Sequence, residues 1–158
     1  MIICPTTLIA NWEREFNLWL TISSKPNIYS IGGRSHSSNE LKLNTIKSWY
    51  SNGGVLLLGF EMFRILNKDS ELKKQASEFL VEPGPDLVIV DEAHRLANSN
   101  SQITEAVKRI KTTKRIALTG YPLQNKLSEY WTMIDFVRPE YLGSLGEVVI
   151  IVKIYLIL

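Results

Sequence analysis

The stretch that most constrains the fold is an apolar run that ends in two carboxylates. Residues 87–90 read Leu-Val-Ile-Val and lead directly into Asp91 and Glu92. An apolar run of this length, with three β-branched members, predicts a strand buried on both faces, as in a parallel sheet covered by helices. Open α/β sheets bind ligands beyond the carboxyl ends of their strands, so the two carboxylates are expected at the ligand-binding edge.

Carboxylates in this position suit a magnesium-nucleotide site. Asp91 can hold Mg²⁺, usually through water, because this hard cation prefers oxygen ligands. Glu92 can orient a water molecule for attack on a phosphate. A simpler interpretation remains open at this point, since two acidic residues after a strand also begin loops or cap helices.

Other parts of the chain repeat the strand pattern. Residues 55–58 and 116–118 are further short apolar runs, and residues 119–125 form a turn-like stretch with Gly, Pro and two amides. Strands alternate with amphipathic helical patterns throughout. This alternation predicts an α/β fold with a mostly parallel sheet and helices on both faces. We expect the strands at 55–58, 87–90 and 116–118 to be neighbours, with Asp91 and Thr119 at one edge.

Two motifs carry a resemblance to a known family. Asp-Glu-Ala-His at 91–94 and Leu-Thr-Gly-Tyr-Pro-Leu-Gln-Asn at 118–125 resemble motifs II and III of helicase superfamily two, in the form found in its Swi/Snf-related branch. Members of that branch are double-stranded-DNA translocases and chromatin remodellers. Tyr121, with Trp131 and the run at 135–139 behind it, resembles the ATRX-like subgroup. The resemblance covers roughly residues 2–143.

The resemblance implies an incomplete first RecA-like lobe of a two-lobed motor. It also implies ATP and Mg²⁺ as cofactors, double-stranded DNA and chromatin proteins as partners, and a nuclear location. Asp91 would hold the magnesium and Glu92 the attacking water. Further residues would link the nucleotide site to motif III or shape its turn: His94, Gln124, Thr119 and Gly120.

Three residues are candidates for DNA contact. Thr6 lies in Pro-Thr-Thr-Leu at 5–8, which with Asn11-Trp12 resembles motif Ia, where a helix start contacts phosphate; a plain N-cap explains Thr6 as well. Arg64 is the surface group of residues 59–64, which resemble motif Ib. Arg34 lies in a polar loop, and a solvated loop is the alternative for it. Trp12 itself falls on an apolar helical face and is expected to pack in the core.

A basic cluster at residues 108–115 has two interpretations. It holds five cations in eight residues: Lys108, Arg109, Lys111, Lys114 and Arg115. The cluster can form a phosphate-facing patch. It can equally be a solvated helix end, since cations favour helix C-termini.

No phosphate-binding loop of the form Gly-x-x-x-x-Gly-Lys-Ser/Thr occurs in the 158 residues. Gly54 and Gly59 have the spacing, but Phe60 stands where Lys is required. We therefore expect this chain alone not to hydrolyse ATP. An α/β interaction module that keeps the fold without the chemistry is the alternative function.

Composition adds limits on partners and compartment. One cysteine, Cys4, excludes an internal disulfide and fits a reduced compartment. Two histidines provide too few ligands for a Cys/His zinc site. The chain begins without a basic segment typical of a signal peptide. The net charge of +2 supplies little long-range attraction for DNA.

Residues 144–158 lie outside the resemblance and form an apolar tail. Ten of the eleven residues at 148–158 are apolar, and Lys153 is the exception. The segment is too short to cross a bilayer, which takes about 20 residues. It is rich in β-branched residues, so it is an aggregation hazard if unpaired. A buried edge strand and a mis-terminated reading frame are the alternatives.

Overall fold

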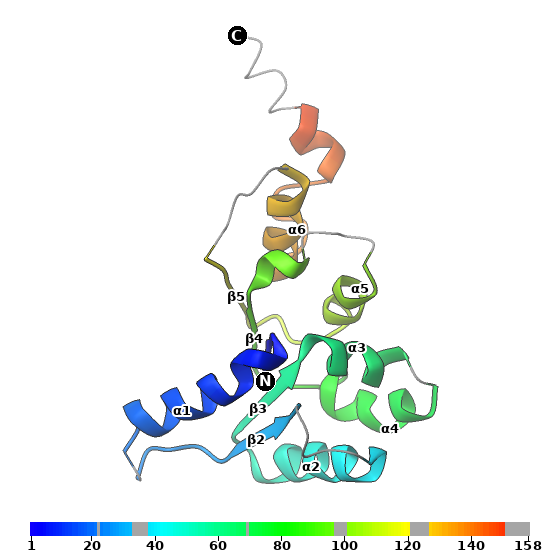
Figure 1. Cartoon of the computed structure of the whole chain (residues 1–158). Helices are drawn as coiled ribbons and strands as arrows, with labels where there is room; N and C mark the ends of the chain where they lie inside the picture. Colours follow the sequence, from blue (N-terminus) through cyan, green and yellow to red (C-terminus); the bar gives the residue numbers. More distant parts are fainter. Residues whose placement is uncertain (22, 33–37, 69, 97–100, 121–126, 151–158) are drawn as a thin grey trace.

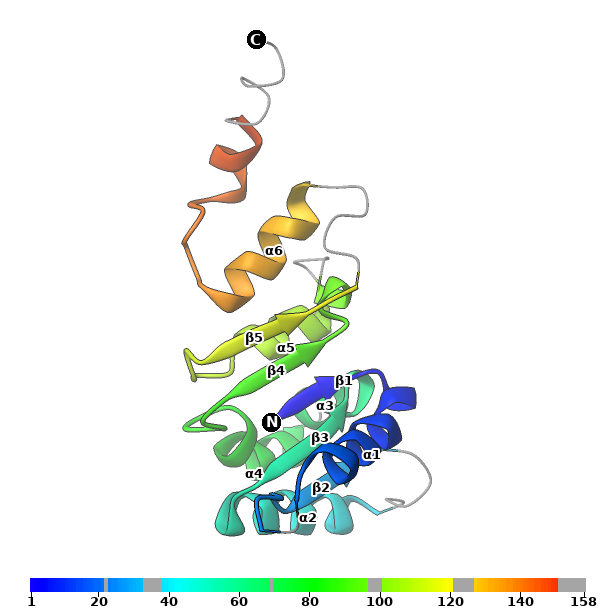
Figure 2. The same ribbon diagram turned by 90° about the vertical axis from the view of Figure 1, so that its left-hand side faces the viewer.

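The computed structural model describes residues 1–21, 23–32, 38–68, 70–96, 101–120 and 127–150. Its strands are β1 (Ile2–Cys4), β2 (Ile28–Ile31), β3 (Val55–Gly59), β4 (Val88–Asp91) and β5 (Arg115–Leu118). The five strands form one parallel sheet in the order β2-β3-β1-β4-β5 (Figures 1 and 2). The predicted α/β class and parallel sheet are confirmed.

Helices connect successive strands. They are α1 (Ile9–Trp19), α2 (Asn39–Asn52), α3 (Phe60–Lys68), α4 (Ser70–Leu80), α5 (Gln102–Lys108) and α6 (Leu127–Val137). Two short 3-10 helices, η1 (Thr6–Leu8) and η3 (Ala93–Leu96), follow β1 and β4. Each of these turns begins where a strand leaves the sheet, so the loops at this edge are held close to the strand ends.

The strand order differs from the prediction in one respect. β4 and β5 are neighbours as expected, but β1 lies between β3 and β4. Ile2, Ile3 and Cys4 are at most 2% exposed, which is the environment of a central strand. Short apolar runs of similar composition predict that each strand is buried, but they do not predict which strands are neighbours. The pairing partner of each strand is decided by the crossover connections.

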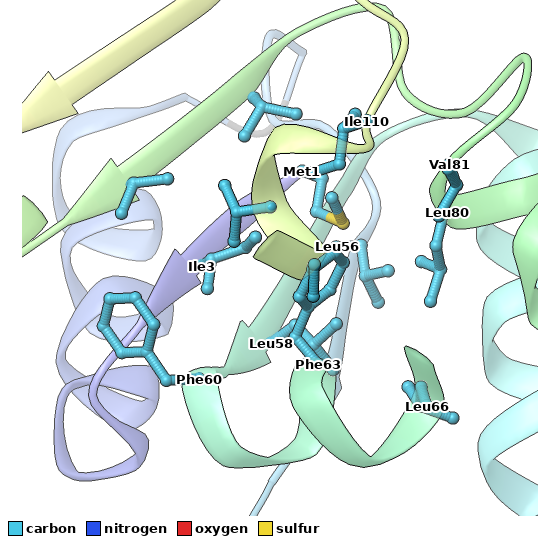
Figure 3. Close-up of a cluster of buried hydrophobic side chains, with 14 of the residues drawn as sticks. Met1, Ile3, Leu56, Leu58, Phe60, Phe63, Leu66, Leu80, Val81 and Ile110 are labelled. Atoms are coloured by element: carbon cyan, nitrogen blue, oxygen red, sulfur yellow. The ribbon is translucent and has the colours of Figure 1, made fainter. Parts of the chain in front are cut away.

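Helices lie on both faces of the sheet, as predicted. On one face α1 covers a small core that contains Ile2, Cys4 and Leu57. On the other face α2 to α5 cover the main core, where Ile3, Leu58 and Phe63 are fully buried (Figures 1 and 3). Alternate residues of β1 and β3 therefore point to opposite cores, as the period of a strand requires.

The face that carries α1 is only partly covered. In Figure 2, α1 lies in front of β1 to β3, while no described helix lies in front of β4 and β5. Ile116 is 41% exposed and Leu118 is 39% exposed on this face. α6 packs beside β5 and adds Met133 and Phe136 to the main core.

The described part of the apolar tail is helical. Residues 145–150 form a helix, and Ile150 is 59% exposed. An edge strand that begins at residue 148 is therefore wrong for the described part, and residues 151–158 lie outside it. Within the described ranges, no helix is both long enough and apolar enough to span a bilayer.

Candidate functional site

The carboxyl ends of the parallel strands bring distant residues to one edge of the sheet. Strand register pairs Asp91 with Leu118 and Cys4 with Gly59. The residues that follow these positions include Thr6, Glu92 and Thr119. The prediction that Asp91 and Thr119 share an edge is confirmed.

The Asp91 carboxylate is held from two directions. Its Oδ2 accepts a hydrogen bond from the indole Nε1 of Trp12 at 2.9 Å, and its Oδ1 accepts one from the backbone N–H of Glu92 at 2.9 Å. The side chain is half-buried. A carboxylate has about four lone-pair positions, so each oxygen can still accept a further hydrogen bond from a metal-bound water.

Glu92 has a strained backbone and an unsatisfied side chain. Its φ of 53° lies in the left-handed region, which costs a non-glycine residue about 1–2 kcal/mol. Its Oε2 is buried and has no hydrogen-bond partner among the described residues; the ring Nδ1 of His94 is 3.2 Å away without hydrogen-bond geometry. Strain and orphaned polar atoms of this kind gather at functional sites.

His94 connects the ends of β4 and β5. Its Nδ1 lies 3.2 Å from Oγ1 of Thr119. Gly120 is exposed, and a Cβ added there would meet nothing within 4 Å. The structure thus places four of the predicted nucleotide-site residues at one edge, with Gly120 beside Thr119. Gln124 lies outside the described residues.

The carboxylates at this edge fit a Mg²⁺ site in which water and phosphate supply most of the ligands. No group of three or more His, Cys, Asp or Glu side chains that could enclose a metal occurs in the described part of the chain. Mg²⁺ is commonly bound through one or two carboxylates, with waters and substrate phosphates completing its octahedron. Asp91, half-exposed at the sheet edge, can supply that single carboxylate.

A polar pocket of about 240 Å³ opens at the same edge. Its walls come from the segments after β1, β3 and β4 and from the start of α5: Thr6, Phe60, Glu61, Arg64, Arg95, Ser101 and Ile103. A Cβ at Gly59 would lie 2.6 Å from Oγ1 of Thr6, so the glycine permits this close approach. The N-cap interpretation of Thr6 is wrong, since Pro5 and Leu8 occupy the N-cap positions of η1 and α1.

The two arginines of this pocket differ in their pairing. Arg64 forms a salt bridge with Glu61 and donates to Oε1 of Gln102 at 2.7 Å. Glu61 raises the pKa of Arg64, and Arg64 lowers the pKa of Glu61. Arg95 is exposed, and its guanidinium lies 4.8 Å from the centre of the Phe60 ring. Arg95 is not among the residues predicted from the sequence, although its position directly after His94 could have indicated it. Arg34 lies outside the described residues.

The basic cluster at 108–115 is mostly engaged within the fold. Lys108 forms a salt bridge with Asp135 at 2.6 Å, and Lys111 lies 3.8 Å from Glu82. Arg115 donates to the carbonyls of Thr112, Phe136 and Ile110. These contacts favour the helix-end interpretation over a phosphate-facing patch.

Comparison with known proteins gives consistent matches over nearly the whole chain. The SNF2-related domain matches residues 1–147. The Drosophila melanogaster protein named transcriptional regulator ATRX homolog is 39% identical over 153 residues, which cover 93% of this chain and 12% of that protein. The human protein named helicase ARIP4 is 33% identical over 186 residues, covering 92% of this chain and 13% of that protein.

A solved structure matches the fold. The Sulfolobus solfataricus SWI2/SNF2 ATPase core in complex with double-stranded DNA superposes with a TM-score of 0.62 at 26% identity, covering 92% of this chain and 26% of that chain. The chain therefore spans about an eighth of these two curated relatives and about a quarter of the matched structure.

Proposed function

The chain belongs to the SNF2-related domain family, and we propose that it forms the part of an ATP-dependent double-stranded-DNA translocase lobe that carries motifs Ia, Ib, II and III. The observation that carries the proposal is the meeting of Asp91, Glu92 and His94 with Thr119 at one sheet edge. The matched relatives are named a transcriptional regulator and a helicase, and these names support the proposal of a nuclear location and chromatin partners.

In the nucleotide half, each residue has a separate task. Asp91 would hold Mg²⁺ through water, and a bound cation would supply neutralisation of the charge on the ATP phosphates. The Oε2 of Glu92, which lacks a donor in the described structure, accepts a proton from the attacking water. His94 connects this position to motif III through Thr119. Gly120 follows Thr119 in the motif, and Gln124 stays in the proposed set by its place in the motif alone.

In the DNA half, the polar pocket receives backbone phosphate. Thr6 supplies a hydroxyl, Arg64 and Arg95 supply charge, and Arg34 stays in the proposed set as a cation of a polar loop, on the sequence alone. Contacts to phosphate carry no base information, so binding should be independent of sequence. Because Glu61 already neutralises part of the Arg64 charge, Arg95 is expected to contribute more.

A salt titration followed by fluorescence anisotropy tests the DNA half. We expect the 158-residue chain to bind duplex DNA in the non-specific range of about 10⁻⁴ to 10⁻⁶ M, with affinity falling steeply as salt rises. Arg95→Ala should weaken binding more than Arg64→Ala, alike for any sequence. Lys114→Ala removes the same charge outside the pocket and is the control. Sequence-selective binding, or binding insensitive to salt, would contradict the proposal.

Phosphate release tests the nucleotide half. Since these residues include no phosphate-binding loop, the chain alone should release phosphate no faster than a buffer blank, with or without DNA. In a longer form of the protein that contains such a loop, Glu92→Gln should abolish turnover. DNA-stimulated release by the 158-residue chain that disappears in Glu92→Gln would show that it carries a complete site.

A further inference from the structure

One contact at the sheet edge joins residues 79 positions apart. Trp12 lies in the first half of α1, and its indole N–H reaches Oδ2 of Asp91 at 2.9 Å. The apolar face of α1 predicts core packing for Trp12, and the ring does pack against the core between α1 and the sheet. The hydrogen bond gives the same side chain a second role.

The packing of Trp12 keeps this donor in place. Its ring lies 6.0 Å from that of Phe16, tilted by 36°, and it contacts the core formed by Ile2, Cys4, Ile9 and Leu57. Because the Trp12 ring is packed on its apolar sides, it cannot move with the Asp91 carboxylate if Asp91 changes rotamer. The indole N–H therefore defines where Oδ2 must lie.

The second oxygen of Asp91 is defined independently. Oδ1 accepts from the backbone N–H of Glu92, a residue whose φ of 53° already departs from the usual backbone regions. With one donor on each oxygen, both the χ1 rotamer and the plane of the carboxylate are determined. Hydrogen bonds to an ionised carboxylate are stronger than neutral ones, which makes the pair effective restraints.

We propose that Trp12 is a positioning residue that holds the Asp91 carboxylate in the single orientation required for magnesium. The inference rests on the proposed nucleotide function of Asp91. Trp12 acts through Asp91 and is not expected to touch nucleotide or metal itself. Without the indole, the carboxylate loses one of two restraints and should sample further rotamers.

The chain provides a matched control on the same helix. Trp19 donates from its indole to Oε2 of Glu15 at 2.8 Å, but its side chain is 77% exposed. Trp12→Phe and Trp19→Phe thus remove the same type of bond from α1. Only the first of these bonds reaches the sheet edge.

Nuclear magnetic resonance on the isotope-labelled 158-residue chain tests the proposal. In the wild type, the two Hα–Hβ couplings of Asp91 should have the values of one rotamer and not those of the rotamer average. In Trp12→Phe they should move toward that average, whereas in Trp19→Phe they should keep the wild-type values. Single-rotamer couplings in a folded Trp12→Phe protein would overturn the proposal.

A wild-type measurement decides the matter if Trp12→Phe does not fold. Hydrogen exchange of the Trp12 indole N–H should be much slower than that of Trp19, and the Asp91 couplings should show one rotamer. Fast exchange of the Trp12 indole, or averaged couplings, overturns the proposal. These measurements need neither nucleotide nor DNA. A failure of the Trp12 proposal can therefore be distinguished from a failure of the proposed function.

Discussion

At the scale of single residues, two adjacent carboxylates have opposite environments. Asp91 has a donor on each oxygen, whereas Oε2 of Glu92 has none among the described residues and its backbone is left-handed. An unsatisfied buried polar atom costs about 1–3 kcal/mol. Glu92 therefore lowers the stability of the fold, a cost that proteins commonly tolerate at sites kept for function.

Replacing Glu92 with Asn should stabilise the protein. Asn tolerates the left-handed region better than Glu and removes the buried, unsatisfied Oε2, so we expect a gain of about 1 kcal/mol in the free energy of unfolding. Urea denaturation measures it. Glu140→Asn is the control, since Glu140 has a φ of 63° but is exposed. Equal gains in both variants would show that backbone strain alone is relieved; a loss in Glu92→Asn would contradict the prediction.

Cys4 should make stability fall at alkaline pH. Burial, and then the charge of Asp91, raise the pKa of its thiol from 9.0 to about 12. Above pH 9 the unfolded chain loses this proton while the folded chain keeps it, so the free energy of unfolding falls by about 1.4 kcal/mol per pH unit.

Comparison with Cys4→Ala isolates this effect from other titrating groups. Between about pH 9 and pH 11, the wild type should lose stability more steeply than the variant. Iodoacetamide should also modify Cys4 slowly in the native protein, because the thiolate is the reactive form. Parallel pH profiles for the two proteins would contradict the assigned cause.

At the scale of elements, Arg115 joins the ends of two helices to β5. Its guanidinium donates to the carbonyls of Ile110, just beyond α5, and Phe136, in the last turn of α6, and it lies 5.3 Å from the centre of the Phe136 ring. Carbonyls at a helix end lack partners within the helix. Burial lowers the pKa of Arg115, but the side chain stays charged at neutral pH.

Arg115→Ala should therefore be among the more damaging changes outside the core. Loss of hydrogen bonds from a charged group to several carbonyls is expected to reduce the free energy of unfolding by about 2–3 kcal/mol. Lys114→Ala, one residue away and exposed, should change it by less than about 0.5 kcal/mol. Denaturant unfolding of the two variants measures both values, and equal effects would reject this role for Arg115.

At the scale of the whole molecule, the sheet has one complete layer of helices and one partial layer. Ile116 and Leu118 are exposed on β5, which is also the last strand in the sheet order. Exposed apolar side chains on an edge strand favour association between copies. The described part of the apolar tail adds a further exposed apolar side chain, Ile150.

A chain that ends at Gly143 should be more soluble than the full chain, with little change in melting temperature. The reason is the removal of a mostly apolar segment whose described residues are all exposed or half-buried. Solubility limits and thermal melts measure the two quantities. Leu118→Gln in the full chain separates the contribution of the sheet face. Unchanged solubility with a lower melting temperature would show that the tail packs as part of the core.

The sequence by itself determined the features that depend on neighbouring residues. The apolar run at 87–90 is sufficient to predict a buried strand, and parallel strands necessarily bring their carboxyl ends to one edge, so Asp91 and Thr119 could be placed together. The motifs at 91–94 and 118–125 indicated the family before any contact was known. The strand inference uses only the pattern of neighbouring residues, and the family inference rests on the resemblance of two short motifs to those of known proteins.

Only the tertiary structure decided which distant groups meet. β1 lies at the centre of the sheet, Trp12 bonds to Asp91, and Arg115 donates to carbonyls of distant residues. No regular spacing in the sequence predicts which of these residues meet. The left-handed φ of Glu92 is equally invisible to a pattern, because Glu has no preference for that region. Strand order and side-chain partners follow from how the helices pack across the sheet, a property of the whole folded chain that no short segment contains.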